Sequence, residues 1–152
     1  MTILRRFLVV QALMLWQGGF LFYASFVVPT GTAVLGSSEA QGSITARVTD
    51  SLNLCGAAGL AMLAWDLLAT ADPSRRRRIV RWSLWLAAAG CQAVLFILHA
   101  RLDAMMDAAR TFVVYRQHFY RLHGVYLWTS TTQWVACLVY TWLTVQAWKA
   151  GR

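Results

Sequence analysis

Charged residues are scarce in this 152-residue chain, where they make up 13% of the sequence against 59% for hydrophobic residues. A soluble domain of this size carries about twice that share of charge. With so little polar surface, the outside of the fold is expected to face a lipid bilayer instead of water. The length suits only one domain, so residues 1–152 are expected to form a single membrane domain.

Catalytic patterns are missing as well. The sequence contains no GxSxG, HExxH, GxGxxG or P-loop pattern. It offers no pair of buried carboxylates for acid–base work, and no nucleophile with a base beside it. We therefore predict a non-enzymatic protein.

Cysteines number three, and all of them fall inside apolar runs: Cys55, Cys91 and Cys137. Their number is odd and no CxxC pair exists, which argues against a disulfide framework and against a cysteine-type zinc site. They are expected to be small buried hydrophobic residues.

Four long apolar runs fill most of the chain, at residues 7–29, 51–71, 82–100 and 124–147. At about 1.5 Å per residue, each helical run would cover about 30 Å, the thickness of the hydrocarbon layer. Backbone groups in lipid must find partners within their own segment, so helices are expected. The first run is too long for a signal-peptide core and is expected to be retained. The predicted fold is all-α, an integral membrane four-helix antiparallel bundle.

Basic residues predict the orientation of this bundle. Nine of the 14 Lys and Arg residues lie near the chain ends or between the second and third runs: Arg5, Arg6, Arg75, Arg76, Arg77, Arg78, Arg81, Lys149 and Arg152. With four spans these places share one side, which the positive-inside rule puts in the cytoplasm. We predict a multi-pass protein of the cytoplasmic (inner) membrane with both termini cytoplasmic. Trp82, Trp85 and Trp148 are expected to form an aromatic belt on that side.

The net charge of +8 does not by itself indicate a nucleic-acid partner. The basic residues cluster at the ends of apolar runs, where Lys and Arg anchor to lipid headgroups. A nucleic-acid surface would need a basic stripe on a soluble element. The lipid bilayer is therefore the expected partner, and nucleic acid is not.

Local signals extend two helices beyond the bilayer on the opposite side. Ser38, with Glu39 next to it, is expected to start a helix that continues into the second run. Residues 101–123 are also expected to be helical, with Asp107 and Arg110 spaced as an i,i+3 pair.

Polar residues are costly in lipid, so their positions predict which face of each helix turns inward. The predicted inward faces hold Gln11, Gly18 and Ser25 on the first run; Asp50, Asn53, Ala57 and Ala61 on the second; Gln92, His99 and Asp103 on the third; and His123, Ser130, Gln133 and Cys137 on the fourth. Small residues there allow helices to approach closely, and the polar side chains can serve only to hydrogen-bond across helices.

A polar site is the alternative role for these faces, on the side away from the basic residues. The candidate ligand-binding residues are Asn53, Gln92, His99, Arg121 and His123. Antiparallel neighbours would bring His99 and His123 to the same depth, and two imidazoles from facing helices can hold a transition metal such as copper, or a haem iron. His118 falls on the other side of its helix and is not expected to join them.

Asp66 is an acidic residue within the second run, near its cytoplasmic end. We expect it to pair with an arginine of the 75–78 run, whose long side chain can reach along the helix. A proton relay would need further carboxylates at other depths of the membrane, and the sequence does not supply them.

The segment RQHFYRLHG, at the start of the fourth helix, resembles the start of the last helix in the transmembrane protein 205 family. The matching residues are Arg116, Gln117, Phe119, Arg121, His123 and Gly124. The first run, with LWQGGFLFYASFVVP, is similar to the Gly- and Phe-rich opening helix of that family. The resemblance implies four spans and hints at handling of a metal or small molecule, because bacterial relatives are grouped with copper-resistance-type membrane proteins. The Ser and Asn that come after the family's His are replaced here by Tyr126 and Ser130.

Three functions are compatible with these features. In the main one, the chain is a membrane protein whose outer-side polar site handles a metal ion or a small molecule. In the second, it is an accessory or structural subunit of a larger membrane complex, or a homo-oligomer, with eight Trp and five Tyr residues supplying contact surface. In the third, it is an electron-transfer subunit that binds haem.

Overall fold

The computed structural model describes residues 2–106, 113–114 and 116–151, and every long element in these ranges is a helix. The prediction of an all-α fold is therefore confirmed. The first helix is continuous over Thr2–Leu35. It consists of α1 (Thr2–Leu13), α2 (Gly19–Phe22) and α3 (Val28–Leu35), joined by π-helical turns at Met14–Gly18 and Tyr23–Val27. The other long helices are α4 (Ser38–Ala69), α5 (Arg75–Asp103) and α6 (Arg116–Ala150).

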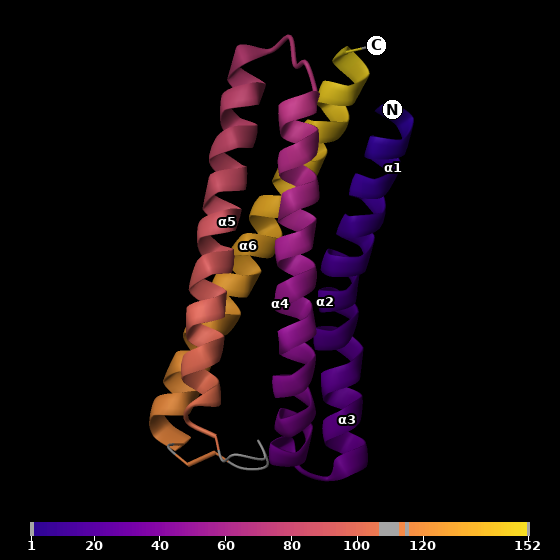
Figure 1. Cartoon of the computed structure of the whole chain (residues 1–152). Helices are drawn as coiled ribbons and strands as arrows, with labels where there is room; N and C mark the ends of the chain where they lie inside the picture. The colour runs from indigo at the N-terminus through magenta and orange to yellow at the C-terminus, as the bar shows by residue number, and fades with distance from the viewer. Residues whose placement is uncertain (1, 107–112, 115, 152) are drawn as a thin grey trace.

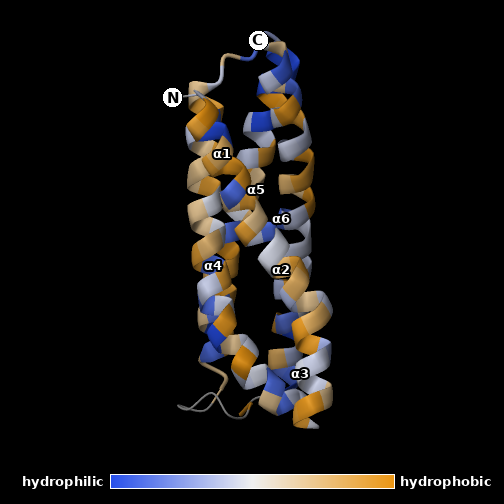
Figure 2. Cartoon of the chain, turned by 90° about the vertical axis from the view of Figure 1, so that its right-hand side faces the viewer, coloured by the Kyte–Doolittle hydropathy of each residue, from blue (hydrophilic) through white to orange (hydrophobic). Residues whose placement is uncertain are grey.

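Three of these helices are long and apolar enough to cross a membrane: the first helix, α4 and α5. Figure 2 shows hydrophobic residues along much of their length, with hydrophilic residues at the ends and in bands between. The predicted fourth run, 124–147, lies inside α6, which is 35 residues long but is not one of the three. Thr, Gln, Trp and Tyr side chains are frequent in α6, and they lower its mean hydropathy.

Each predicted run lies almost entirely within a longer helix, and the helix start near Ser38 is confirmed. The Ser37 hydroxyl caps α4 by accepting hydrogen bonds from the backbone N–H groups of Glu39 (3.1 Å) and Ala40 (3.3 Å). Gly36 separates α4 from α3 with a φ of 64°, a left-handed conformation that suits glycine. Gly36 and Ser37 thus make the tight connection between the first two long helices.

The prediction of a helix over 101–123 is wrong for part of that range. α5 ends at Asp103 and α6 begins at Arg116, and neither 104–106 nor 113–114 is helical. The expected Asp107–Arg110 pair lies outside the described residues.

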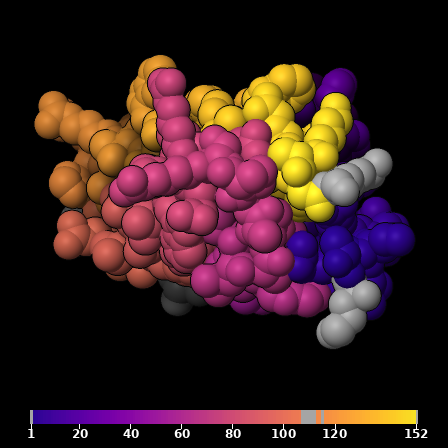
Figure 3. Space-filling view, turned by 90° about the horizontal axis from the view of Figure 1, so that it is seen from above, coloured from indigo at the N-terminus to yellow at the C-terminus, as the bar shows by residue number. Residues whose placement is uncertain are grey.

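The chain ends and the turn between α4 and α5 lie at one end of the molecule (Figure 1). We call this the basic end, because it carries Arg5, Arg6, Arg75, Arg76, Arg77, Arg78, Arg81 and Lys149. The opposite end, the far end, holds the turn between α3 and α4. In Figure 1, α6 crosses behind α4, so that its C-terminal part lies near α1 and its N-terminal part lies beside α5. Seen from the basic end, side chains of α1, α4, α5 and α6 meet over this surface (Figure 3).

A buried charge cluster joins all four long helices at the basic end. Asp66 of α4 and Arg81 of α5 are both fully buried, and they form an ion pair of 3.3 Å. Arg5 of α1 pairs with the same carboxylate at 2.9 Å, and the Trp148 indole of α6 donates to both of its oxygens at 3.1 and 3.2 Å. The expectation that Asp66 pairs with the 75–78 run is wrong, because Arg81 lies one turn further along α5 and points inward.

Arg81 makes further contacts that explain its complete burial. Its Nε donates to the Thr144 hydroxyl at 3.2 Å, and its guanidinium lies 5.4 Å from the centre of the Tyr140 ring. The Tyr140 hydroxyl in turn donates to the Leu63 carbonyl at 3.0 Å. The Arg81 guanidinium therefore contacts a carboxylate, a hydroxyl and an aromatic face, while its Nη1 lies 3.9 Å from the Asp72 carboxylate and makes no hydrogen bond to a described residue.

The turn between α4 and α5 has an ion pair of its own. Arg77 donates two hydrogen bonds to the Asp72 carboxylate, at 2.6 and 2.8 Å. These bonds hold the pKa of Asp72 below its usual value. The Ser74 backbone N–H also donates to Asp72 at 2.9 Å, which fixes the start of α5.

Trp16 packs closely against α4, and this packing defines the inward face of the first helix. A Cβ atom added at Gly59 would lie 2.8 Å from the Trp16 ring, and one added at Gly56 would lie 2.9 Å from its Nε1. The buried residues of the first helix are Val9, Leu13 and Trp16. The predicted inward face is wrong here, because Gln11, Gly18 and Ser25 are all exposed.

The other predicted inward faces fare differently. Ser130, Gln133 and Cys137 of α6 and Gln92 of α5 are buried, which confirms those faces. On α4 the prediction is wrong in part, because Asn53 is buried while Asp50 and Ala61 are exposed.

The predicted aromatic belt is also corrected by the structure. The Trp85 indole turns inward and donates to the Leu60 carbonyl at 2.9 Å, and Trp148 turns inward onto Asp66. Both side chains therefore join α4 to its neighbours instead of extending toward headgroups.

We predict that Asp66→Asn destabilises the protein by about 3 to 5 kcal/mol, because it leaves Arg81 charged and fully buried with only the more distant Asp72 carboxylate, 3.9 Å away, as a counterion. The measurement is the free energy of unfolding of the purified protein in mild detergent, followed by helical circular dichroism as SDS is added. Asp103→Asn is the matched control, because the Asp103 side chain is partly exposed and lies at the far end. It is expected to change the free energy of unfolding by less than about 1 kcal/mol. Equal stability of Asp66→Asn and wild type would contradict a structural role for the cluster.

Candidate functional site

A cavity of about 480 Å³ lies in the half of the molecule away from the basic end. All four long helices line it, through residues within 16–32, 38–53, 92–103 and 119–134. It exists because α6 lies near α1 at the basic end and diverges from the first helix toward the far end (Figure 1). Its volume falls in the range of about 300 to 1,000 Å³ that is typical of small-molecule sites.

Two glutamines close the inner part of the cavity. The Gln133 side chain donates to the Ala88 carbonyl and to Gln92 Oε1, both at 3.0 Å. Gln92 Nε2 donates to the Asn53 carbonyl at 3.3 Å. Both glutamines are buried, and their bonds join α4, α5 and α6. Hydrogen bonds of this kind between helices are common in membrane proteins.

Asn53 is buried beside them and is only partly satisfied. Its Oδ1 accepts a hydrogen bond of 3.0 Å from the Tyr126 hydroxyl, but no described residue accepts a hydrogen bond from its Nδ2. Trp134 likewise has an unsatisfied donor, because its buried Nε1 has no acceptor among the described residues. Both side chains line the cavity.

The first helix and α4 meet along another polar contact. Gln41 is buried, and its Nε2 donates to the Tyr23 hydroxyl at 3.3 Å and to the Thr45 hydroxyl at 3.4 Å. The Gln41 side chain also fills the space that a Cβ atom at Gly31 would need. This side of the cavity is therefore closed by polar groups that already have partners.

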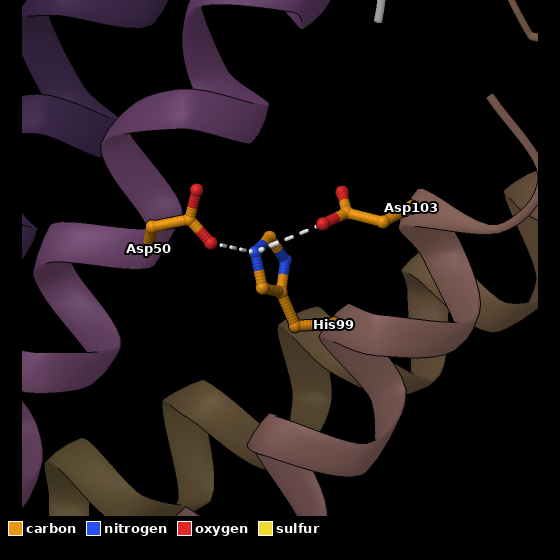
Figure 4. A group of neighbouring side chains, drawn as sticks. All are labelled: Asp50, His99 and Asp103. Atoms are coloured by element: carbon orange, nitrogen blue, oxygen red, sulfur yellow. Dashed lines mark hydrogen bonds and ion pairs between the residues drawn. The ribbon is translucent and has the colours of Figure 1, made fainter. Parts of the chain in front are cut away.

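Three ligating side chains meet near the rim of the cavity (Figure 4). His99 and Asp103 come from α5, and Asp50 comes from α4. His99 Nε2 lies 2.6 Å from Asp50 Oδ1 and 3.6 Å from Asp103 Oδ2. One ligand atom from each of the three residues lies within 4.8 Å of the others. Figure 4 shows the two carboxylates on either side of the imidazole.

Glu39, another acidic residue of the far end, is not part of the group formed by Asp50, His99 and Asp103. Its carboxylate pairs with Arg116 at the start of α6. Both residues are largely exposed, so the pair connects α4 and α6 at the surface.

The structure brings four of the five predicted site residues to the cavity: Asn53, Gln92, His99 and His123. Arg121 is exposed and does not line it. The two histidines have different partners, because His99 contacts carboxylates while the His123 ring stacks on Phe119, with 5.8 Å between ring centres. His118 is exposed outside the cavity, on the other side of α6 as predicted.

Sequence reasoning missed Tyr126 and Trp134 as parts of the site. Both are aromatic residues of an apolar run, which gives no signal that one polar atom is turned inward. Asp50 and Asp103 were placed on inward faces, but nothing in their spacing showed that they would meet at His99.

Comparison with protein-family models, curated proteins and solved structures gave no match for this chain.

Proposed function

We propose that the chain is an integral membrane protein whose four long helices cross the bilayer as an antiparallel bundle. Three of them have the required length and apolar character. α6 would be about 50 Å long at about 1.5 Å per residue, which is more than enough to span the bilayer. Gln133 and several of the hydroxyl groups of α6 face the interior, while Trp128, Leu138 and Trp142 are exposed toward the surroundings. A lipid-facing surface on α6 is therefore compatible with its lower mean hydropathy.

The distribution of basic residues supports an orientation within this proposal. Lys and Arg are concentrated at the end that holds both termini, and such an excess is typical of the cytoplasmic side. We place that end in the cytoplasm and the protein in the cytoplasmic (inner) membrane. Kinship with the transmembrane protein 205 family remains part of the same proposal, on the sequence of residues 116–124.

The function we propose is the non-enzymatic binding of a small molecule in the cavity of the outer half. The cavity itself is the observation that carries this proposal. Most of the surface that its walls expose is apolar, and the polar side chains among its lining residues include Asn53, Gln92 and Gln133. This combination is typical of sites that enclose the apolar body of a ligand and fix its orientation with a few hydrogen bonds.

A divalent metal ion at Asp50, His99 and Asp103 is a second candidate function, carried by the geometry of Figure 4. One imidazole and two carboxylates form a donor set that suits Zn²⁺ and other first-row divalent ions. The partial exposure of these side chains leaves a route from the outer solution. His123, the second imidazole predicted for a haem site, stacks on Phe119 and does not join this group.

We predict that the basic end is cytoplasmic, and single cysteines test this. In a variant with Cys55, Cys91 and Cys137 replaced by Ala, a membrane-impermeant maleimide added to spheroplasts is expected to label Ser38→Cys at the far end. Pro73→Cys in the basic-end turn is expected to react only after the membrane is permeabilised. The reverse pattern, or labelling of both, would contradict the orientation.

We predict that the cavity retains a small molecule through purification in mild detergent. Native mass spectrometry of the wild type is expected to show a bound mass of a few hundred daltons, as suits a cavity of this size. Ala46→Phe fills part of the cavity and should abolish that mass, while Ala93→Phe, on the exposed face of α5, should retain it. A bound mass that survives in Ala46→Phe would place the ligand elsewhere.

We predict that the wild type binds one Zn²⁺ per chain at the rim, as measured by isothermal titration calorimetry at neutral pH. Asp103→Asn removes one ligand and is expected to weaken binding at least about tenfold. Glu39→Gln is the matched control at the same end, because Glu39 pairs with Arg116, and it should leave Zn²⁺ affinity unchanged. Equal losses in both variants would indicate diffuse attraction to surface charge and overturn the site.

A further inference from the structure

Two residues that line the cavity carry a buried N–H group without an acceptor among the described residues, at Asn53 Nδ2 and Trp134 Nε1. Asn53 as a whole is only 4% exposed. Buried donors without acceptors are rare in folded proteins, because leaving one unpaired is unfavourable. Both residues line the same cavity, one from α4 and one from α6. Something that occupies the cavity is therefore expected to supply the acceptor.

The neighbouring polar groups do not supply it. Gln133 Nε2 and Gln92 Nε2 each donate to a carbonyl, and Gln92 Oε1 already accepts from Gln133. The Tyr126 hydroxyl donates to Asn53 Oδ1, which uses the other end of the same amide. The cavity therefore offers an incoming molecule hydrogen-bond donation at this level.

The charges around the cavity determine which kind of acceptor fits. No lysine or arginine occurs among the described residues that line it, whereas Glu39 and Asp103 do line it. An anionic ligand would therefore meet no counterion there and would be repelled by carboxylates. A neutral oxygen, such as that of a ketone, quinone or ester, accepts hydrogen bonds without this penalty.

We infer that the ligand is a neutral, largely apolar molecule with a carbonyl-type oxygen, which accepts hydrogen bonds from Asn53 Nδ2 and Trp134 Nε1. This inference rests on the proposed binding function and adds the chemical class of the ligand. The apolar walls enclose its body, and the two donors hold its oxygen. The Gln92–Gln133 pair keeps the donors in place by fixing α4, α5 and α6 relative to one another.

The test uses 9-fluorenone and fluorene, which share one tricyclic frame and differ in the carbonyl oxygen. Tritiated 9-fluorenone is bound to the full-length protein in nanodiscs and read by scintillation proximity, with empty nanodiscs as the blank. Unlabelled fluorenone is expected to displace it at about tenfold lower concentration than fluorene, as two modest hydrogen bonds would give. Trp134→Phe and, separately, Asn53→Leu are each expected to reduce that ratio to about threefold or less.

Trp128→Phe is the matched control, because Trp128 is an exposed tryptophan of the same helix and does not line the cavity. It should keep the wild-type ratio. Equal displacement by fluorenone and fluorene in the wild type would overturn the inference while leaving the binding cavity intact. Absence of any displaceable binding would overturn both. A wild-type ratio that persists in Trp134→Phe would exclude its indole as a donor, and this variant keeps the test decisive if Asn53→Leu does not fold.

Discussion

The carboxylate of Asp66 is the constraint on which the arrangement of the helices depends. A fully buried carboxylate requires cations and hydrogen-bond donors in a fixed geometry. Asp66 obtains them from three other helices through Arg5, Arg81 and Trp148. Each contact sets both the depth and the rotation of the helix that supplies it. The cluster therefore specifies how all four helices meet at the basic end, which apolar packing alone would fix less sharply.

The far end has no comparable cluster among the described residues, and there the helices separate. At one end α6 lies near α1, where the Arg6 guanidinium is 5.3 Å from the centre of the Trp148 ring, while further along it runs beside α5 (Figure 1). The Gln92–Gln133 contact marks the level at which the interior changes from closed to open. Below it toward the basic end lie Leu63, Ala88 and Tyr140, all buried, and beyond it lies the cavity. The helices thus meet closely at the basic end, where the Asp66 cluster joins them, and separate at the far end, where the described residues form no comparable cluster.

The regular parts of this structure could be predicted from the sequence, and the irregular parts could not. The helices were predicted from apolar runs, and the inward faces of α5 and α6 from a period of about 100° per residue, which holds because neither helix is interrupted. In the first helix the predicted face was already wrong at Gln11, which is exposed and precedes both π-helical turns, so the choice of starting residue failed there. The Asp66–Arg5 pair, 61 residues apart in sequence, left no local signal either.

Polar residues in the interior of this protein fall into two groups, and the difference between them separates structure from function. Gln92 and Gln133 bond to groups on other helices, so their polarity is accounted for by holding the fold together. Asn53 and Trp134, which line the cavity, each carry a buried N–H group without an acceptor in the described chain. Hydropathy treats both groups alike, since it counts polar atoms and not their partners. Among the residues that line the cavity, the pattern of satisfied and unsatisfied donors separates the side chains that join helices from those whose donors have no acceptor in the described chain.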